Sequence, residues 1–171
     1  MNKEYNFRNI TLNDTHLVNC IISSIRQKHN LRDHLKVLEV GCGSGTFLLY
    51  MIDMLSKTFP KITFDFYAFD IQESELTFKD DESKEPHLSR LHSTLKRKYK
   101  NDTWEKKIRI INPSDDWHEQ LEFFDLIISN QVLEHVADKS TFFNKLNKNL
   151  KASGNSFHLF PTLDVLWEWH I

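Results

Sequence analysis

A short apolar run that passes directly into three alternating glycines is the feature that most constrains the fold of this chain. The run Val37–Val40 is followed by Gly41, Gly43 and Gly45, and an amphipathic stretch comes next. This pattern predicts a buried strand, a tight turn and the start of a helix. Because glycine has no Cβ, its backbone can adopt positive φ and a ligand can approach it closely. The first turn of the helix presents backbone N–H groups to the same ligand.

The spacing of the glycines argues against a dinucleotide as that ligand. The dinucleotide fingerprint is G-x-G-x-x-G, and its third glycine would fall at Thr46, whereas this chain has Gly45. Glu39, two residues before the first glycine, would repel a pyrophosphate and suits a ligand with positive charge. A nicotinamide-dependent oxidoreductase is therefore disfavoured.

The segment from Glu39 to Gly45 resembles the first motif of the class I S-adenosylmethionine-dependent methyltransferases, an acid-x-G-x-G-x-G turn after the first strand. S-adenosylmethionine (SAM) carries a sulfonium, an ammonium, a ribose and an adenine but no phosphate, so an acidic, glycine-lined site suits it electrostatically. The resemblance implies that Glu39 meets the positively charged methionine end of SAM. It also implies that the cofactor lies against the turn residues Gly41, Cys42, Gly43, Ser44 and Gly45.

An acid at the end of the next strand is the second feature that bears on the ligand. A crossover helix over Thr46–Lys57 and a strand over Ile62–Phe69 complete a right-handed parallel βαβ unit. Asp70 then stands at the carboxyl end of that strand, where open α/β sheets bind ligands. The resemblance implies that Asp70 accepts hydrogen bonds from the ribose hydroxyls and that the neighbouring Ile71 belongs to the same site. The alternative is a carboxylate that only caps the strand.

A fourth-strand segment carries the other strong resemblance. Phe124–Val136 is similar to the F-D-L-I-x-S-x-x-V-L-E-H-V motif of small-molecule class I methyltransferases. In that family the residues that follow the strand border the methionine part of the cofactor and the substrate, and here they are Asn130 and Gln131. His135 is a candidate general base, because an imidazole titrates near neutral pH. A histidine at a helix start that bonds only to the backbone is the other interpretation.

The segment before the fourth strand includes the expected adenine contacts. Ile108–Ile111 is predicted as a short third strand. The family places an Asp near the adenine amino group in the loop that follows; here Ser114 falls at that position and Asp115 one residue later, so either can accept that hydrogen bond. Trp117 either stacks on the adenine or packs within the loop.

Two further helices are predicted outside these motifs. Thr11 and Asp14 form the N-cap and N3 positions of a helix that ends near residues 29–30. This helix either covers a sheet face or edge, which is favoured, or forms a lid over the cofactor. Within residues 71–107, an acidic loop precedes an amphipathic helix that begins near Pro86 and has a basic outer face. A solvated helix face is favoured there over a nucleic-acid patch.

The last part of the chain supplies a helix, a turn and a fifth strand. The helix is predicted over Asp138–Lys151, and Leu150–Gly154 resembles the L-K-P-G-G turn of the family with its Pro and one Gly replaced. The strand is predicted over Ser156–Phe160, and an apolar tail follows in residues 161–171. The resemblance implies seven strands in the full fold, whereas five are expected here.

The predicted fold is therefore an α/β three-layer sandwich around a mostly parallel, Rossmann-like sheet that lacks the C-terminal strands of the full family fold. Residues 1–34 are expected to be an N-terminal arm and helix, and residues 35–171 a SAM-binding domain with an insertion-like segment at 71–107 and a truncated C-terminus. The apolar tail packs on the sheet or forms a homodimer contact.

Composition narrows the partners and the compartment. The 171 residues have a formal net charge of −2, so no global field attracts nucleic acid or an anionic membrane. No run approaches the roughly 18 apolar residues of a membrane span, and the two cysteines, Cys20 and Cys42, are expected to be free thiols in the cytoplasm. No metal site is assigned.

The function that these features favour is a SAM-dependent methyltransferase that acts on a small-molecule or carrier-bound acceptor and releases S-adenosylhomocysteine (SAH). A non-catalytic domain of the same fold that binds a protein partner is the alternative.

Overall fold

The structure is a computed structural model, and it describes residues 9–27, 33–70, 87–99, 105, 107–111 and 122–161. The strands in this part of the chain are β1 (His34–Val40), β2 (Thr63–Phe69), β3 (Ile108–Ile111), β4 (Phe124–Asn130) and β5 (Leu150–Leu159). The helices are α1 (Leu12–Gln27), α2 (Thr46–Thr58), α3 (His87–Lys98), the short 3₁₀ helix η4 (Leu133–His135) and α4 (Lys139–Asn149).

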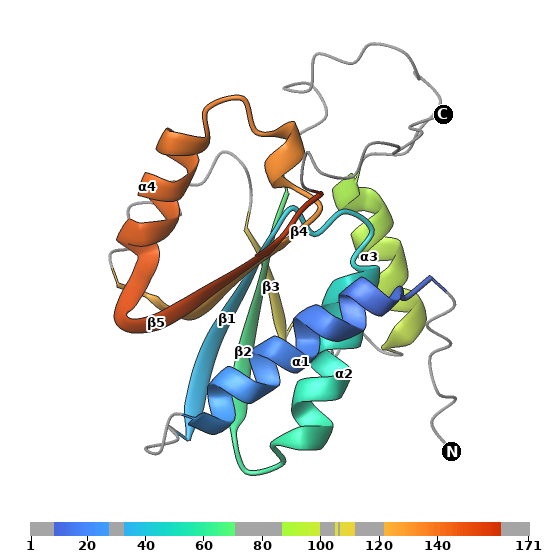
Figure 1. Ribbon diagram of the computed structural model, residues 1–171. Coiled ribbons are helices and arrows are strands. Elements are labelled where there is room, and N and C mark those ends of the chain that lie inside the picture. The colour runs from blue at the N-terminus through green and yellow to red at the C-terminus, as the bar shows by residue number, and fades with distance from the viewer. Residues whose placement is uncertain are drawn as a thin grey trace.

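The five described strands form one parallel sheet in the order β3-β2-β1-β4-β5 (Figure 1). The central strand β1 pairs with β2 on one side and with β4 on the other. Val40, its last residue, pairs with Phe69 of β2 and with Ser129 of β4. Because the strands are parallel and in this register, the carboxyl ends of β1, β2 and β4 meet at one edge of the sheet. The residues that follow these three strands are therefore brought together.

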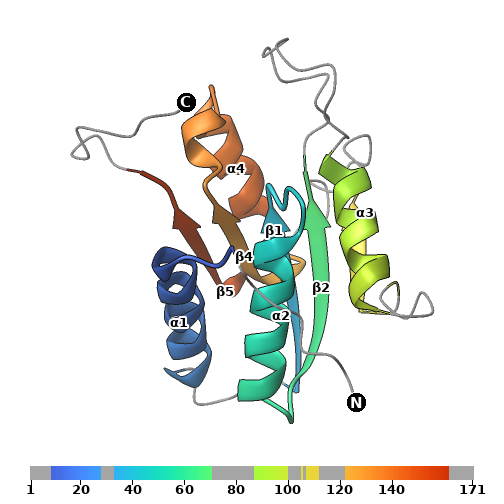
Figure 2. The same ribbon diagram turned by 90° about the vertical axis from the view of Figure 1, so that its right-hand side faces the viewer.

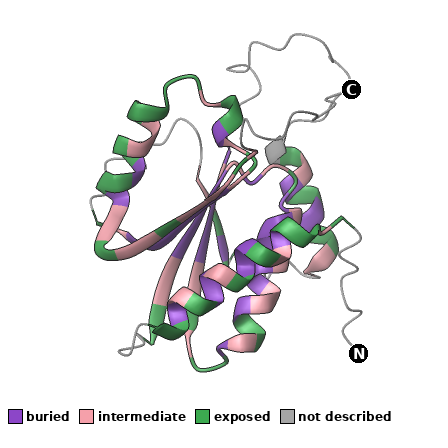
Figure 3. Ribbon diagram, in the orientation of Figure 1, coloured by how far each residue is buried: buried purple, intermediate pink, exposed green. Residues whose placement is uncertain are grey.

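Helices cover both faces of the sheet and make it the middle of three layers. The helices α1 and α2 lie on one face and α4 lies on the other (Figure 2). Buried residues are concentrated in the strands and on the inner sides of the helices (Figure 3). Leu91 and Leu95 of α3 join the core on the side of α1 and α2, whereas Leu146 of α4 packs in the opposite core with Val40 and Ile127. The predicted α/β three-layer fold is confirmed.

The helix α1 begins with the predicted cap. The Thr11 backbone N–H donates to Asp14 Oδ2 at 2.7 Å, and the Asp14 N–H donates to Thr11 Oγ1 at 3.1 Å, which is a reciprocal capping arrangement. Val18, Ile21 and Ile25 are buried in the core, and α1 packs against α2 and β5. The favoured interpretation, a helix that covers a sheet face, is confirmed; the predicted end of the helix lies outside the described residues.

The start of β5 differs from the prediction. The strand begins at Leu150, so the turn predicted over Leu150–Gly154 is wrong, and Gly154 does not have the positive φ of a helix-ending glycine. The reason is a non-local pairing: Leu150 pairs with Phe124, and a register shift between Phe124 and Leu126 accommodates the extra length of β5. Helix α4 accordingly ends at Asn149.

Candidate cofactor site

The glycine turn between β1 and α2 adopts the conformation that only glycine tolerates easily. Gly41, Gly43 and Gly45 have φ of 76°, 49° and 77°, in the left-handed region that side chains disfavour. The turn is fixed to the end of β2, because the N–H groups of Gly41 and Cys42 both donate to the carbonyl oxygen of Phe69, at 2.8 and 3.1 Å. The strand ends and the turn thus form one connected backbone unit.

The three glycines have different surroundings. A Cβ placed on Gly41 would lie 2.2 Å from Cγ2 of Val132, and one on Gly45 would lie 2.2 Å from Cδ1 of Leu91. A Cβ placed on Gly43 would have no described heavy atom within 4 Å beyond its immediate chain neighbours. At Gly41 a Cβ would overlap with Val132, the residue before η4, so packing as well as the positive φ favours glycine there. At Gly45 the overlap is only with the end of the flexible Leu91 side chain of α3, so the positive φ is the main constraint. Gly43 is the position at which a ligand can approach the backbone.

Asp70 lies directly against this turn. Its side chain is 5% exposed, and its Oδ2 accepts a hydrogen bond from the Gly43 backbone N–H at 2.5 Å. The structure therefore brings together the predicted strand-end acid and the predicted ligand turn. The carboxylate points at the glycines rather than away from them.

Glu39 is the most buried acid of the described residues. It is 1% exposed, and its Oε2 has no hydrogen-bond partner in this part of the chain. Burial, followed by the negative charges of Asp70 and Asp14, raises the pKa of Glu39 well above its ordinary value. An orphaned carboxyl oxygen among other acids fits a ligand that brings positive charge or hydrogen-bond donors.

Cys42 lies in the same turn but has a different character. The thiol is buried, and burial, with the charges of Glu39 and Asp70 adding to it, raises the pKa of Cys42 well above its ordinary value. A thiol under these conditions stays protonated, so Cys42 fills space in the turn and does not serve as a nucleophile.

Asn130 and Asp14 form a contact that sequence reasoning missed. Asn130, the last residue of β4, donates from Nδ2 to Asp14 Oδ1 at 2.6 Å, across 116 positions of the chain. Asp14 is 8% exposed, so this hydrogen bond is largely shielded from solvent. The sequence offered no signal for this role, because the helix cap with Thr11 already explains an acid at this position.

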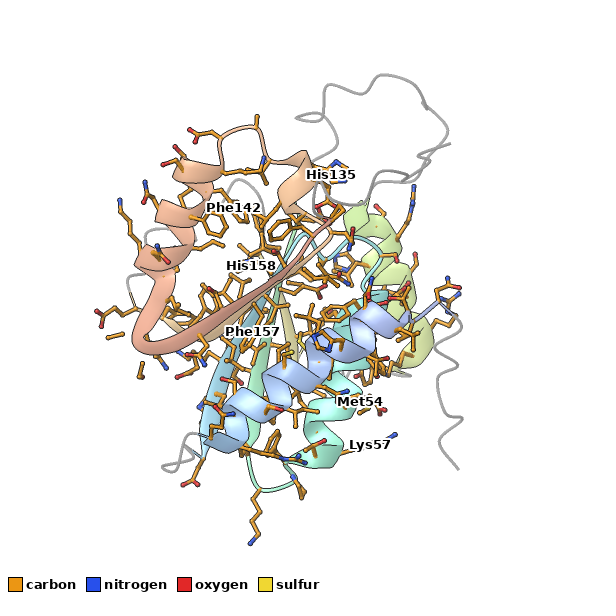
Figure 4. The ribbon with its side chains drawn as sticks, viewed as in Figure 1. Met54, Lys57, His135, Phe142, Phe157 and His158 are labelled. Atoms are coloured by element: carbon orange, nitrogen blue, oxygen red, sulfur yellow. The ribbon has the colours of Figure 1, made fainter. Side chains whose placement is uncertain are left out.

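Three other predicted site residues are exposed. Gln131 has φ of 56° and is anchored by its backbone N–H, which donates to the Leu159 carbonyl at 2.8 Å. Ser44 lies in the turn with its Oγ 3.2 Å from Thr46 Oγ1. His135 lies in η4 with its backbone N–H bonded to the Val132 carbonyl at 2.9 Å. Figure 4 shows His135 at the end of the molecule opposite to Met54 and Lys57 of α2.

Several predicted residues lie outside the described part of the chain: Ile71, the two adenine candidates Ser114 and Asp115, Trp117, and residues 162–171 of the apolar tail.

Among the described residues, no group of three or more His, Cys, Asp or Glu side chains could hold a metal ion. None of the described helices has the length and apolar character required to cross a membrane.

Residues 16–170 match the protein family described as a methyltransferase domain. The chain belongs to this methyltransferase family. A search of curated proteins found no match to the chain.

Solved structures with the same fold include enzymes named for methyl transfer. An S-adenosylmethionine-dependent methyltransferase from Mesorhizobium loti is 16% identical, with 89% of this chain and 55% of that chain covered and a TM-score of 0.53. The trans-methyltransferase CalH, in complex with SAH, is 14% identical, with 85% and 37% covered and a TM-score of 0.56. The PH0226 protein from Pyrococcus horikoshii is 20% identical, with 96% and 68% covered and a TM-score of 0.55.

The methyltransferase chain is shorter than many proteins of its fold. It covers 57%, 49% and 42% of the length of three other similar structures, and so spans about half of them. The structural similarity shows a shared Rossmann-like fold, and together with the family match it confirms the predicted fold of class I methyltransferases.

Proposed function

We propose that this methyltransferase transfers a methyl group from SAM to a small-molecule or carrier-bound acceptor. The observation that carries the proposal is the hydrogen bond between Asp70 and Gly43, because it places a buried acid beside a glycine that no other described residue covers. That combination suits a sugar with two hydroxyls that lies against a peptide backbone, and it is found at the carboxyl edge of the sheet.

The described side chains fit the separate parts of SAM. Asp70 would hold the ribose hydroxyls, and Gly43 would let the cofactor lie against the turn. Glu39, with its orphaned Oε2, would meet the positively charged methionine end. Asn130 and Gln131 would border the methionine part and the acceptor, and either Ser114 or Asp115 would accept from the adenine amine.

The reaction requires mainly alignment from the protein. SAM supplies an activated methyl group bonded to a sulfonium. Transfer of this methyl group to a lone pair of the acceptor would break the carbon–sulfur bond and leave its electron pair on sulfur, as the neutral thioether of SAH. This chain's residues would hold the two reactants in line. His135, which is exposed near the carboxyl edge, would remove a proton only if the acceptor atom arrives protonated.

Isothermal titration calorimetry with SAH tests the proposal. We expect binding by the wild-type protein and affinity at least tenfold weaker in Asp70→Ala, because the variant loses charged hydrogen-bond acceptors in a buried site. Asp65→Ala is the matched control, since Asp65 lies within β2, near the start of the strand, and its Oδ2 is 2.9 Å from His34 Nε2. The proposal fails if SAH and SAM do not bind, or if Asp70→Ala binds SAH as tightly as Asp65→Ala does. A thermal shift with NAD and none with SAH would indicate an oxidoreductase instead.

A further inference from the structure

Both carboxylate oxygens of Asp14 accept hydrogen bonds from other residues of the chain. Oδ2 accepts from the backbone N–H of Thr11 at 2.7 Å and from its hydroxyl at 2.8 Å, and Oδ1 accepts from Asn130 Nδ2 at 2.6 Å. The side chain therefore joins the first turn of α1 to the carboxyl end of β4. Any effect of Asp14 on a ligand at that edge would therefore be transmitted through Asn130.

The bond from Asp14 fixes the orientation of the Asn130 amide. An ionised carboxylate only accepts hydrogen bonds, so it selects the orientation in which the NH₂ group faces Asp14. The carbonyl end of the amide then points away from Asp14. Asn130 Oδ1 is buried, and none of the described residues donates to it.

Glu39 offers a second orphaned acceptor on the same side of the sheet. Glu39 pairs with Ile128 of β4, and Asn130 lies two residues further along that strand, so the two side chains share one face. Both side chains therefore project from one face of the sheet near its carboxyl edge. Glu39 is 1% exposed with Oε2 unpartnered. Buried acceptors without donors are rare in folded proteins and require an explanation.

We propose that Asp14 is a positioning residue of the SAM site: it orients Asn130 so that Asn130 Oδ1 and Glu39 Oε2 both accept hydrogen bonds from the ammonium group of the cofactor. This inference rests on the proposed function. A primary ammonium carries three N–H donors and a positive charge, and so satisfies both orphaned oxygens and the acidic surroundings. The helix α1 thereby contributes to recognition of the amino-acid part of the cofactor, although it contributes no direct contact.

Two ligands separate this role from a general structural one. SAH contains the ammonium group, whereas 5′-methylthioadenosine has the same nucleoside and thioether but no amino-acid part. By calorimetry, we expect Asp14→Ala to weaken SAH binding roughly tenfold and to leave methylthioadenosine binding unchanged. Asn130→Ala should show the same selective loss, and the double variant should be no weaker than either single variant, because both act through one contact.

Matched variants control for the helix cap and for folding. Thr11→Val removes the capping hydroxyl but retains Asp14, and Asp138→Ala removes a comparable cap at α4, where Asp138 accepts from the Thr141 N–H at 3.0 Å. Neither should change the ratio of the two affinities. Asp14→Asn keeps the size of the side chain and can still cap α1, but its NH₂ group favours a flipped Asn130. It should therefore lose SAH affinity selectively while it unfolds at nearly the wild-type temperature.

Two results would overturn the role of Asp14. Equal weakening of SAH and methylthioadenosine in the Asp14 variants would show a structural role only. Unchanged SAH affinity in Asp14→Ala and Asp14→Asn would show no role at all. If the wild-type protein binds neither ligand, the proposed function fails together with the inference, and this outcome is distinct because the wild-type protein alone reveals it.

Discussion

The Asp70 carboxylate and the Gly43 backbone N–H are joined by a hydrogen bond of 2.5 Å between residues 27 positions apart. Asp70 follows β2, and Gly43 lies in the turn between β1 and α2. The bond therefore closes the βαβ unit at the edge where ligands bind in open α/β sheets. The turn that accommodates this bond contains three glycines, and substitutions can test the role of each one.

Replacement of these glycines by alanine should separate packing from binding. Gly41→Ala combines an unfavourable φ with a contact at 2.2 Å to Val132, so we expect the free energy of unfolding to fall by about 2–4 kcal/mol. Gly43→Ala has only the unfavourable φ and should lose about 1–2 kcal/mol, but its methyl group would project into the cofactor's position and weaken SAH binding. Urea unfolding and calorimetry measure the two effects. An equal fall in the free energy of unfolding in both variants would contradict the conclusion that packing constrains Gly41 but not Gly43.

Glu39→Gln should stabilise the ligand-free protein and weaken SAH binding. The folded-state pKa of Glu39 is raised, chiefly by burial. Its protonated form therefore contributes stability below the ordinary carboxyl pKa. This stability is lost as the pH rises through the raised pKa. The glutamine has no charge to bury. We therefore expect the variant to gain roughly 1–3 kcal/mol near neutral pH and to lose this part of the pH dependence, as measured by urea unfolding at several pH values.

SAH binding by the wild-type protein should be coupled to loss of the proton from the Glu39 carboxyl group. Because the ammonium group favours ionised Glu39, binding releases a proton and strengthens as pH rises toward the raised pKa. Calorimetry in buffers with different ionisation enthalpies measures this release. If the binding enthalpy is independent of the buffer in both the wild-type protein and Glu39→Gln, SAH binding does not release a proton from Glu39.

His158 should produce the opposite slope of stability with pH. Its Nδ1 lies 2.7 Å from Ser129 Oγ, its Nε2 is buried without a described partner, and burial lowers the pKa of the imidazole. Its contribution to stability is therefore present above the ordinary imidazole pKa and is lost as pH falls through the lowered value. The melting temperature of His158→Gln should fall less on acidification than that of the wild-type protein. The exposed His135→Gln is the control and should melt like the wild-type protein at each pH.

The ion pair between the buried Asp125 and the half-buried Lys151 should matter for stability and not for the cofactor. Asp125 is 6% exposed, and its Oδ2 accepts from Lys151 Nζ at 2.8 Å and from the Lys36 backbone N–H at 2.9 Å. Asp125→Ala removes the acceptor for both donors, so we expect a loss of about 3 kcal/mol in the free energy of unfolding. SAH affinity measured well below the melting temperature should not change. A selective loss of SAH affinity would place Asp125 in the site.

The sequence predicted those parts of the site that depend on local pattern. Gly41–Gly45 has a spacing that specifies a turn, and Asp70 follows an uninterrupted strand, so the order of residues alone places both at the carboxyl edge. The contact between Asp14 and Asn130 could not be predicted in this way, because each residue already had a sufficient local explanation. The start of β5 at Leu150 was missed for a related reason: it depends on pairing with Phe124, which is distant in sequence.

The central position of β1 has a consequence for the order in which the candidate cofactor site assembles during folding. Its partner β2 follows after one helix, whereas pairing with β4 closes a much longer loop, as the 89 positions between Lys36 and Asp125 indicate. Long-range closure of this kind is slow, so we expect β4, which ends at Asn130, to pair with β1 only late in refolding. We therefore expect SAH to leave the refolding rate unchanged and to slow unfolding, so that the ligand prolongs the lifetime of the native state without assisting its formation.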